Sequence, residues 1–302
     1  MSNRLLRFQI ANTPVRAEWV ELSDAWQQVV HRHQLDANTL SLLGQLTAAS
    51  LLLAATLKHR GSLTAQIVGD GPISLMVVEC QANGAFRATV KLSARHPMPE
   101  QAAPSIDTLI NPGGKARFAI TLDPKEQGKS AYQGIVPIEG DSVARMLERY
   151  MFRSEQLPTR LWLAADANRV AGLLLQRLPD PELEQAVDFD TDAWGRMQKL
   201  AETLQPEEML SNDAETMLHR LFWQEETGAV ETRPMRFECL CSRAKVSAML
   251  QMLGQSEVES IVREQGQISV NCEYCNTAYS FDAVDAATLF ETSVAPSTQT
   301  RQ

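Results

Sequence analysis

The chain has 302 residues, of which 44% are hydrophobic; it is long enough for a full-sized core with one or two smaller units, and its composition excludes wholesale disorder. The formal net charge is −9 at pH 7 and no basic cluster stands out, so nucleic acid is not an expected partner. The N-terminus lacks the apolar run and the small-residue cleavage site of a secretory signal, so a soluble, cytoplasmic protein is predicted.

Residues 1–179 are predicted to form one α+β domain. The uncharged stretch 40–57 contains polar residues and a glycine, which favours a buried helix over a membrane span, with Asn38 or Thr39 as its cap. A second helix is expected over 142–152, capped by Asp141. Strands are expected at 63–67, 73–80, 86–90, 117–122, 132–138, 161–164 and 172–178. Successive hairpins with few intervening helices favour an antiparallel sheet covered by helices.

The segment 180–236 is predicted to be a helical, acidic linker. Between positions 180 and 238 the sequence has 15 Asp and Glu against 5 Arg and Lys, so nearly all of the net charge lies there. Two helical stripes break this acidity: the first has Trp194, Met197, Ala201 and Leu204, and the second, capped by Asn212 with Glu215, has Met217, Leu218, Leu221 and Phe222. Two interpretations remain open: a linker docked on the core, or a metastable segment that is folded only while something holds it.

The C-terminal unit, residues 237–291, contains four of the five cysteines, and the tail 292–302 is expected to be disordered. The pattern is Cys239-Leu-Cys241, thirty residues, then Cys272-Glu-Tyr-Cys275. Four soft thiolates at this spacing in a reducing compartment predict one tetrahedral zinc ion per chain. The fifth cysteine, Cys80, ends an apolar run and is predicted to be a small buried side chain.

Local patterns around the cysteines predict a small fold. Strand-like flanks at 268–270 and 279–281 surround the second cysteine pair, and Asn276 is a residue that tolerates a left-handed turn. One helix ends at Gly254 and a second, over 256–265, ends at Gly266. The first is expected to bury four side chains: Val246, Met249, Leu250 and Leu253. Such a unit is too small to fold well without the metal.

The residues alone leave the role of the zinc open. Tetrahedral zinc places neighbouring sulfurs ~3.8 Å apart, and a disulfide needs ~2.05 Å, so a small contraction would pair them and expel the metal. Zinc also keeps the sulfurs as thiolates, which is the form that oxidants attack. A structural staple and a redox switch are therefore both compatible with the pattern.

Several segments together resemble the 33 kDa chaperonin family, the redox-regulated heat-shock holdases. They are the two cysteine motifs, the stretch YMFRSEQLPTR from Tyr150 to Arg160, the turn GDGP from Gly69 to Pro72, the stretch YQGIV from Tyr132 to Val136, and EGD from Glu139 to Asp141. The match covers nearly the whole chain in the expected order. One departure is Asn276, where a glycine is common.

The resemblance implies a bacterial cytosolic protein whose reduced, zinc-bound form is inactive. Oxidation is then expected to pair Cys239 with Cys241 and Cys272 with Cys275 and to release the zinc. The C-terminal unit and the linker would loosen and expose apolar surface that captures unfolding client proteins, and active members of the family dimerise. This interpretation expects no ATP, no nucleic acid and no membrane.

Two other classes of function fit the sequence less well: an enzyme and a zinc-ribbon interaction module. An enzyme is not expected, because Gly128-Lys-Ser130 resembles the end of a phosphate loop but Asp123 stands where that motif needs glycine. A four-thiolate zinc also has no open position for catalysis. A zinc-ribbon interaction module, with the zinc only as a staple, remains the alternative function. A ribbon that contacts nucleic acid would need basic surroundings, whereas acidic residues surround this one: Glu238, Glu257, Glu259, Glu264 and Glu273.

Overall fold

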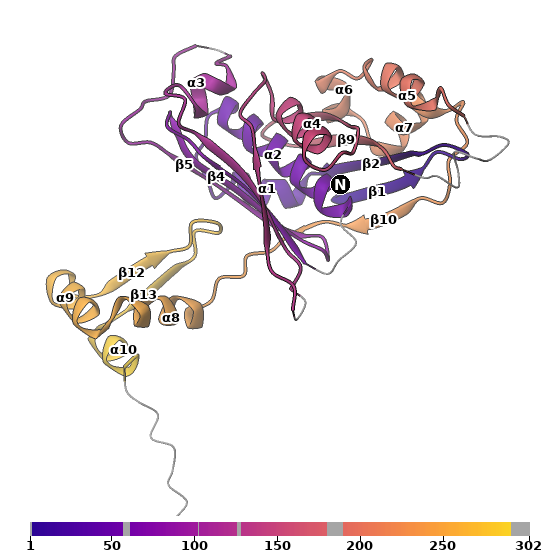
Figure 1. Cartoon of the computed structure of the whole chain (residues 1–302). Coiled ribbons are helices and arrows are strands. Elements are labelled where there is room, and N and C mark those ends of the chain that lie inside the picture. The colour runs from indigo at the N-terminus through magenta and orange to yellow at the C-terminus, as the bar shows by residue number, and fades with distance from the viewer. Residues whose placement is uncertain (1, 57–60, 102, 126–127, 180–189, 291–302) are drawn as a thin grey trace, which may run out of the picture. The chain divides into compact units, whose positions relative to one another are not determined.

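The computed structural model describes residues 2–56, 61–101, 103–125, 128–179 and 190–290. The chain divides into two compact units, 1–238 and 239–302 (Figure 1). The tail 292–302 and the first part of the linker, 180–189, lie outside the described residues. The rest of the linker belongs to the first unit in this structure, so the separation of 180–236 from 1–179 stays a prediction.

The first unit contains two sheets rather than the single one expected. One sheet has the order β10-β1-β2-β9-β8, and every neighbouring pair in it is antiparallel. Its strands are β1 (Arg4–Gln9), β2 (Val15–Leu22), β8 (Thr159–Ala165), β9 (Val170–Arg177) and β10 (Glu231–Pro234). Sequence reasoning missed β1 and β2, although Val15, Ala17 and Trp19 alternate with Arg16 and Glu18 at the start of β2. All eight residues of β2 are buried.

The second sheet has the order β11-β5-β4-β3-β6-β7, and only the short β11 runs parallel to its neighbour. Its strands are β3 (Ser62–Val68), β4 (Ile73–Gln81), β5 (Ala85–Leu92), β6 (Arg117–Asp123), β7 (Tyr132–Val136) and β11 (Arg236–Phe237). The predicted turn from Asn83 to Gly84 joins β4 to β5, and Gly84 has a φ of 82°, which L side chains rarely adopt. The antiparallel prediction is confirmed for both sheets, apart from β11.

Helix α2 (Ala37–Thr56) forms the middle of this unit, because it packs against strands of both sheets (Figure 1). Of the described helices it alone is long and apolar enough to cross a membrane, but 78% of its apolar window is buried inside the protein. The predicted buried helix is thus confirmed. The predicted caps, Asn38 and Thr39, are wrong. The cap is Asp36, whose carboxylate accepts hydrogen bonds from the backbone N–H groups of those two residues.

Three further helices complete the core domain: α1 (Asp24–Val30), α3 (Ile106–Ile110) and α4 (Val143–Arg153). Helix α4 was expected, but its cap was assigned wrongly. The Ser142 hydroxyl accepts the amide hydrogen of Arg145, while Asp141 caps nothing. A serine in the extended conformation one residue later supplies the same acceptor.

The described part of the linker forms three helices on the free face of the first sheet: α5 (Ala193–Ala201), α6 (Pro206–Ser211) and α7 (Ala214–Phe222) (Figure 1). They share one apolar cluster with β1, β2, β8 and β9, to which Trp19, Met197 and Met217 contribute. Helix α6 was not predicted. The cap of α7 is Asp213, which accepts the amide hydrogen of Thr216, and not Asn212.

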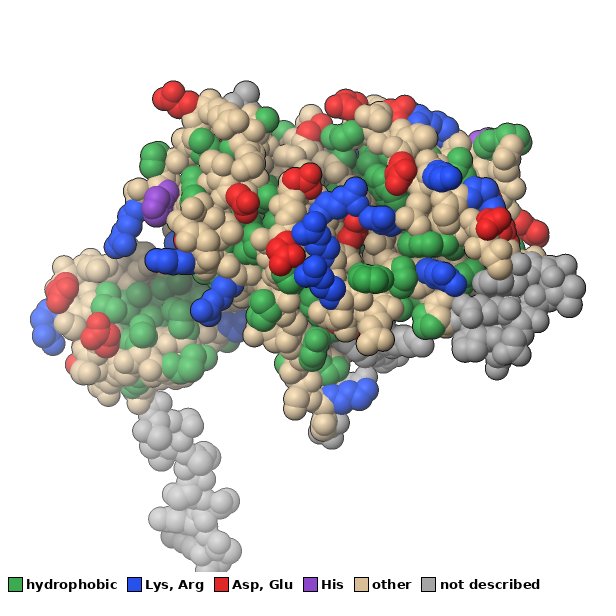
Figure 2. Space-filling model, turned by 45° about the horizontal axis from the view of Figure 1, so that its top comes forward, with side chains coloured by type: hydrophobic (Ala, Val, Ile, Leu, Met, Phe, Trp, Pro, Cys, Tyr) green, Lys and Arg blue, Asp and Glu red, His purple; other side chains and the backbone are tan. Residues whose placement is uncertain are grey.

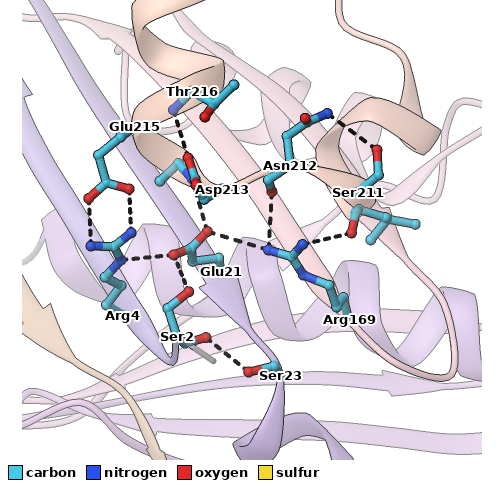
Figure 3. A network of polar contacts seen from close by, with 12 residues as sticks. Ser2, Arg4, Glu21, Ser23, Arg169, Ser211, Asn212, Asp213, Glu215 and Thr216 are labelled. Carbon is cyan, nitrogen blue, oxygen red and sulfur yellow. Dashed lines mark hydrogen bonds and ion pairs between the residues drawn. The ribbon is translucent and has the colours of Figure 1, made fainter.

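A network of polar contacts fastens the loop between α6 and α7 to the first sheet (Figure 3). Glu21 is buried; its carboxylate accepts hydrogen bonds from Arg4 Nε at 2.8 Å and from the backbone N–H of Ala214 at 3.1 Å. Arg169 donates to the carbonyl oxygens of Leu210 at 2.9 Å and Asn212 at 3.1 Å. Arg4 also forms a two-pronged contact with Glu215. We call this set the linker clasp.

The second unit is small. Its elements are α8 (Arg243–Leu253), α9 (Gln255–Gln265), β12 (Ile268–Asn271), β13 (Ala278–Phe281) and α10 (Ala283–Thr288). Its buried core consists of five side chains: Leu250, Val258, Ile268, Phe281 and Ala286. Met249 and Leu253, predicted to point inward, are 40% and 52% exposed, because α8 has a small core on one side only. Helix α10 was not predicted.

Candidate metal centre

The four clustered cysteines lie at two turns of the second unit. Cys239 and Cys241 lie between β11 and α8, and the hydroxyl of Ser242 caps α8 by accepting the amide hydrogen of Lys245 at 3.2 Å. Cys272 and Cys275 lie in the turn between β12 and β13, which is closed by a hydrogen bond from the N–H of Asn276 to the carbonyl of Cys272 at 2.8 Å. The φ of Asn276 is 55°. The predicted left-handed turn at this residue is confirmed.

The structure brings all four sulfurs together. Every pair lies within 4.8 Å; Cys239 and Cys272 are 3.6 Å apart, and Cys241 and Cys275 are 3.3 Å apart. Each cysteine is partly buried. A tetrahedral metal with four thiolates at ~2.3 Å requires sulfur separations of ~3.8 Å. The arrangement therefore fits a metal ion, and the sulfur set, which has no oxygen or nitrogen donor, suits a soft one such as zinc.

The thiols differ in how readily they ionise. Burial raises the pKa of Cys239 to about 12, and burial also raises that of Cys241, although the Tyr279 hydroxyl donates to its sulfur at 3.1 Å. Burial acts in the same direction on Cys275, but hydrogen bonds from the hydroxyl and the backbone of Thr277 outweigh it and lower the pKa to about 6. Of these thiols, Cys275 is therefore the one whose environment most favours the thiolate.

Supporting residues that sequence reasoning missed surround the sulfurs. Tyr279 and Thr277 each place a hydroxyl at 3.1 Å from a sulfur. Arg243 joins α8 to β13, because it donates to the carbonyl of Ser280 at 2.8 Å and stacks over the Phe281 ring at 4.2 Å. The positions of Thr277 and Tyr279, two and four residues after Cys275, were the available signal. Cys80, in contrast, is fully buried in β4 within the first unit, as predicted.

Comparisons with known proteins identify the family of this chain. A family model described as Hsp33 protein matches residues 3–282. The chain belongs to the Hsp33 family. It is 45% identical over 295 residues to the 33 kDa chaperonin of Methylobacillus flagellatus, covering 97% of this chain and 96% of that one. The corresponding figures for the 33 kDa chaperonin of Chromobacterium violaceum are 44% over 289 residues, with coverage of 96% and 94%.

A solved structure shows the same fold. The crystal structure of the 33 kDa chaperonin of Thermotoga maritima superposes with a TM-score of 0.80 at 22% identity, covering 96% of this chain and 98% of that one. The family resemblance expected from the sequence is therefore confirmed over nearly the whole chain. Membership in the Hsp33 family supports a chaperone function, and no enzymatic activity is known for that family.

Proposed function

We propose that this Hsp33 family member is a redox-regulated, ATP-independent holdase that binds unfolding proteins after its thiols are oxidised. Its reduced form would hold one zinc ion through Cys239, Cys241, Cys272 and Cys275. The support is the four-sulfur cluster, whose separations suit tetrahedral thiolate coordination. When bound, the zinc would keep all four sulfurs as thiolates and stabilise a unit whose own core has only five buried side chains.

Oxidation is proposed to join Cys239 to Cys241 and Cys272 to Cys275. Each disulfide forms when two thiolates give two electrons to hydrogen peroxide, whose O–O bond breaks and which takes up two protons from the solvent to yield two molecules of water. A sulfur in a disulfide carries no thiolate charge for a metal. The proposed pairs lie within 4.8 Å, as do the cross-pairs, so the assignment rests on the family resemblance and not on proximity.

The observation that carries the proposal is the apolar interface beneath the linker. The cluster shared by the sheet and α5–α7 contains nine buried side chains from the strands, Ile10 just after β1, and nine from the linker, among them Trp19, Leu173 and Phe222. If α5–α7 detach, this whole face meets water. Exposed apolar surface binds unfolded chains by the same burial that folds proteins, at about 25 cal/mol per Å² covered.

The proposed clients are unfolded or partly folded proteins. The oxidised form is proposed to be a homodimer in the cytoplasm. The acidic linker would keep the opened form soluble. No nucleic acid, membrane or ATP takes part.

An aggregation assay tests the proposal. Reduced, zinc-loaded protein and peroxide-oxidised, zinc-free protein are added in equal amounts to a client that unfolds on heating, without ATP, and light scattering is followed. We expect the oxidised protein to suppress aggregation and the reduced protein not to do so. Equal activity of the two forms would make the zinc a staple of an interaction module and overturn the redox proposal.

A further inference from the structure

The first unit has a groove that is rich in arginines. It has a volume of about 590 Å³ and lies between α4, the start of β8 and α5. Four of its lining residues are arginines, and we call them the groove arginines: Arg145, Arg149, Arg153 and Arg160. The first three are spaced by four residues and so share one face of α4. Two aromatic side chains, Phe152 and Trp194, also line it.

The groove arginines are only half neutralised. Arg145 and Arg160 share the carboxylate of Glu148, at 2.9 and 3.0 Å. Arg149 and Arg153 share that of Glu139, at 3.5 and 3.3 Å. Four positive charges thus face two negative ones, in a chain with a net charge of −9. One face of the molecule shows such a run of adjoining Lys and Arg side chains with acidic ones around it (Figure 2).

The arginines also have hydrogen-bond donors to spare. Glu148 already accepts three hydrogen bonds, since its second oxygen accepts the backbone N–H of Leu161 at 2.9 Å. Within the described chain, Arg145, Arg153 and Arg160 donate hydrogen bonds through Nη1 or Nε, and Arg149 has only an ion-pair contact through Nη1. The Nη2 groups of all four donate to no protein atom of that part of the chain. Guanidinium groups with free N–H donors match the oxygens of a phosphate in charge and in planar geometry.

We propose that this groove binds a multivalent oxyanion of the phosphate type and that the bound anion fastens α5 to the core domain. A multivalent anion neutralises the excess charge and satisfies several Nη2 groups at once. Helix α5 forms one wall of the groove through Trp194 and Gln198, and Gln198 accepts a hydrogen bond from Arg160 Nε at 3.0 Å. An anion that needs this wall binds only the docked linker, and it therefore stabilises that state by mass action.

Anion binding and its effect on α5 are separate properties of the groove. Anion binding concerns the reduced protein and requires no chaperone activity. The effect on α5 rests on the proposed function, in which α5 leaves the sheet. An anion held in the groove would then raise the threshold for activation without touching the cysteines.

Calorimetric titration of the reduced protein with pyrophosphate, at constant ionic strength, tests the site. We expect binding of one pyrophosphate per chain, weakened at least tenfold in Arg149→Ala/Arg153→Ala. The matched control, Arg95→Ala/Arg117→Ala, removes two exposed arginines elsewhere and should change the affinity less than twofold. Absence of binding to the wild type, or an equal loss in both double variants, would overturn the site. An affinity for adenosine diphosphate more than tenfold above that for pyrophosphate would overturn recognition by the phosphates alone.

Hydrogen exchange of α5 tests the coupling. At pyrophosphate tenfold above its dissociation constant, amides of α5 that exchange through undocking should slow about tenfold. Binding without this slowing overturns the coupling and leaves the site standing. An α5 that is unprotected even in the reduced, anion-free protein contradicts the docked linker of the proposed function instead, so the two failures are distinguishable.

Discussion

Replacement of Cys275 tests the assignment of the metal site. The Cys275 sulfur lies in the four-sulfur cluster and has the lowered pKa, about 6, of the group. Replacing Cys275 by Ser substitutes a hard oxygen for a soft thiolate and breaks the S₄ set. We expect metal analysis of reduced protein to give close to one zinc per chain for the wild type and far less for Cys275→Ser. Cys80→Ala, a change in the core of the other unit, should keep the full amount, and its losing zinc as well would contradict the assignment.

Glu18 makes the stability of the first unit depend on pH. Its side chain on β2 is fully buried, neither carboxylate oxygen has a hydrogen-bond partner, and burial raises its pKa to about 7 despite the opposing charges of Arg16, Arg7 and Arg233. Glu231 is the acidic neighbour that adds to the rise. Since the folded pKa lies above the ordinary value of 4.5, this group's stabilisation is complete below that value and is lost as pH rises through 7.

Glu18→Gln should therefore make the free energy of unfolding less dependent on pH. Between pH 5 and pH 8, the free energy of unfolding of Glu18→Gln should fall less steeply than that of the wild type, by up to about 1.4 kcal/mol per pH unit. Urea unfolding at several pH values, followed on the reduced protein, measures the difference. Parallel curves for the two proteins would mean that Glu18 is charged in the folded state at pH 5, against the effect of its burial.

At the scale of elements, the linker clasp holds α6 and α7 through charges rather than apolar contacts alone. Arg169 is bonded to two carbonyl oxygens of the α6–α7 loop and lies 3.6 Å from Glu21. Arg169→Ala leaves those carbonyls without a donor and weakens the pairing of the buried Glu21, which costs about 1–3 kcal/mol. Hydrogen exchange of α7 in reduced, zinc-loaded protein should therefore accelerate at least several-fold. Arg117→Ala, at the exposed first residue of β6, serves as the control and should not change it.

Sequence reasoning was most successful where residue chemistry is local. The two cysteine motifs, the positive φ of Asn276 and the turn at Gly84 could be read directly, because each depends on a few adjacent residues. It failed for β2, because the apolar–polar alternation is confined to 15–19 and no local pattern predicts that its glutamates and arginine are buried. It also failed for the clasp, since Arg4, Glu21 and Arg169 are far apart in sequence and no spacing rule joins them. Predicted caps were wrong by one to three residues, because neighbouring Asp, Asn, Ser and Thr are nearly equivalent acceptors.

At the scale of the molecule, the two units differ in how they are stabilised. The first has two large apolar clusters, on either side of a five-stranded sheet, and the second has a core of five side chains beside four thiols. Loss of metal therefore threatens the second unit far more than the first. In the proposed mechanism, oxidation both releases the metal and forms the disulfides, so the two effects occur together in the wild type.

A variant with serine at all four cysteine positions, 239, 241, 272 and 275, separates the two effects. It can form no disulfide and lacks the thiolates that a zinc ion prefers. We expect its amides in α8, α9 and β12 to lose protection, since five buried side chains do not offset the entropy of ordering this unit. If exposed apolar surface is what binds clients, this variant should suppress aggregation of a heat-unfolded client partly. The suppression should be weaker than with oxidised wild type and stronger than with reduced wild type. A variant that loses this protection yet stays as inactive as reduced wild type would show that the disulfides, and not the unfolding, create the client-binding surface.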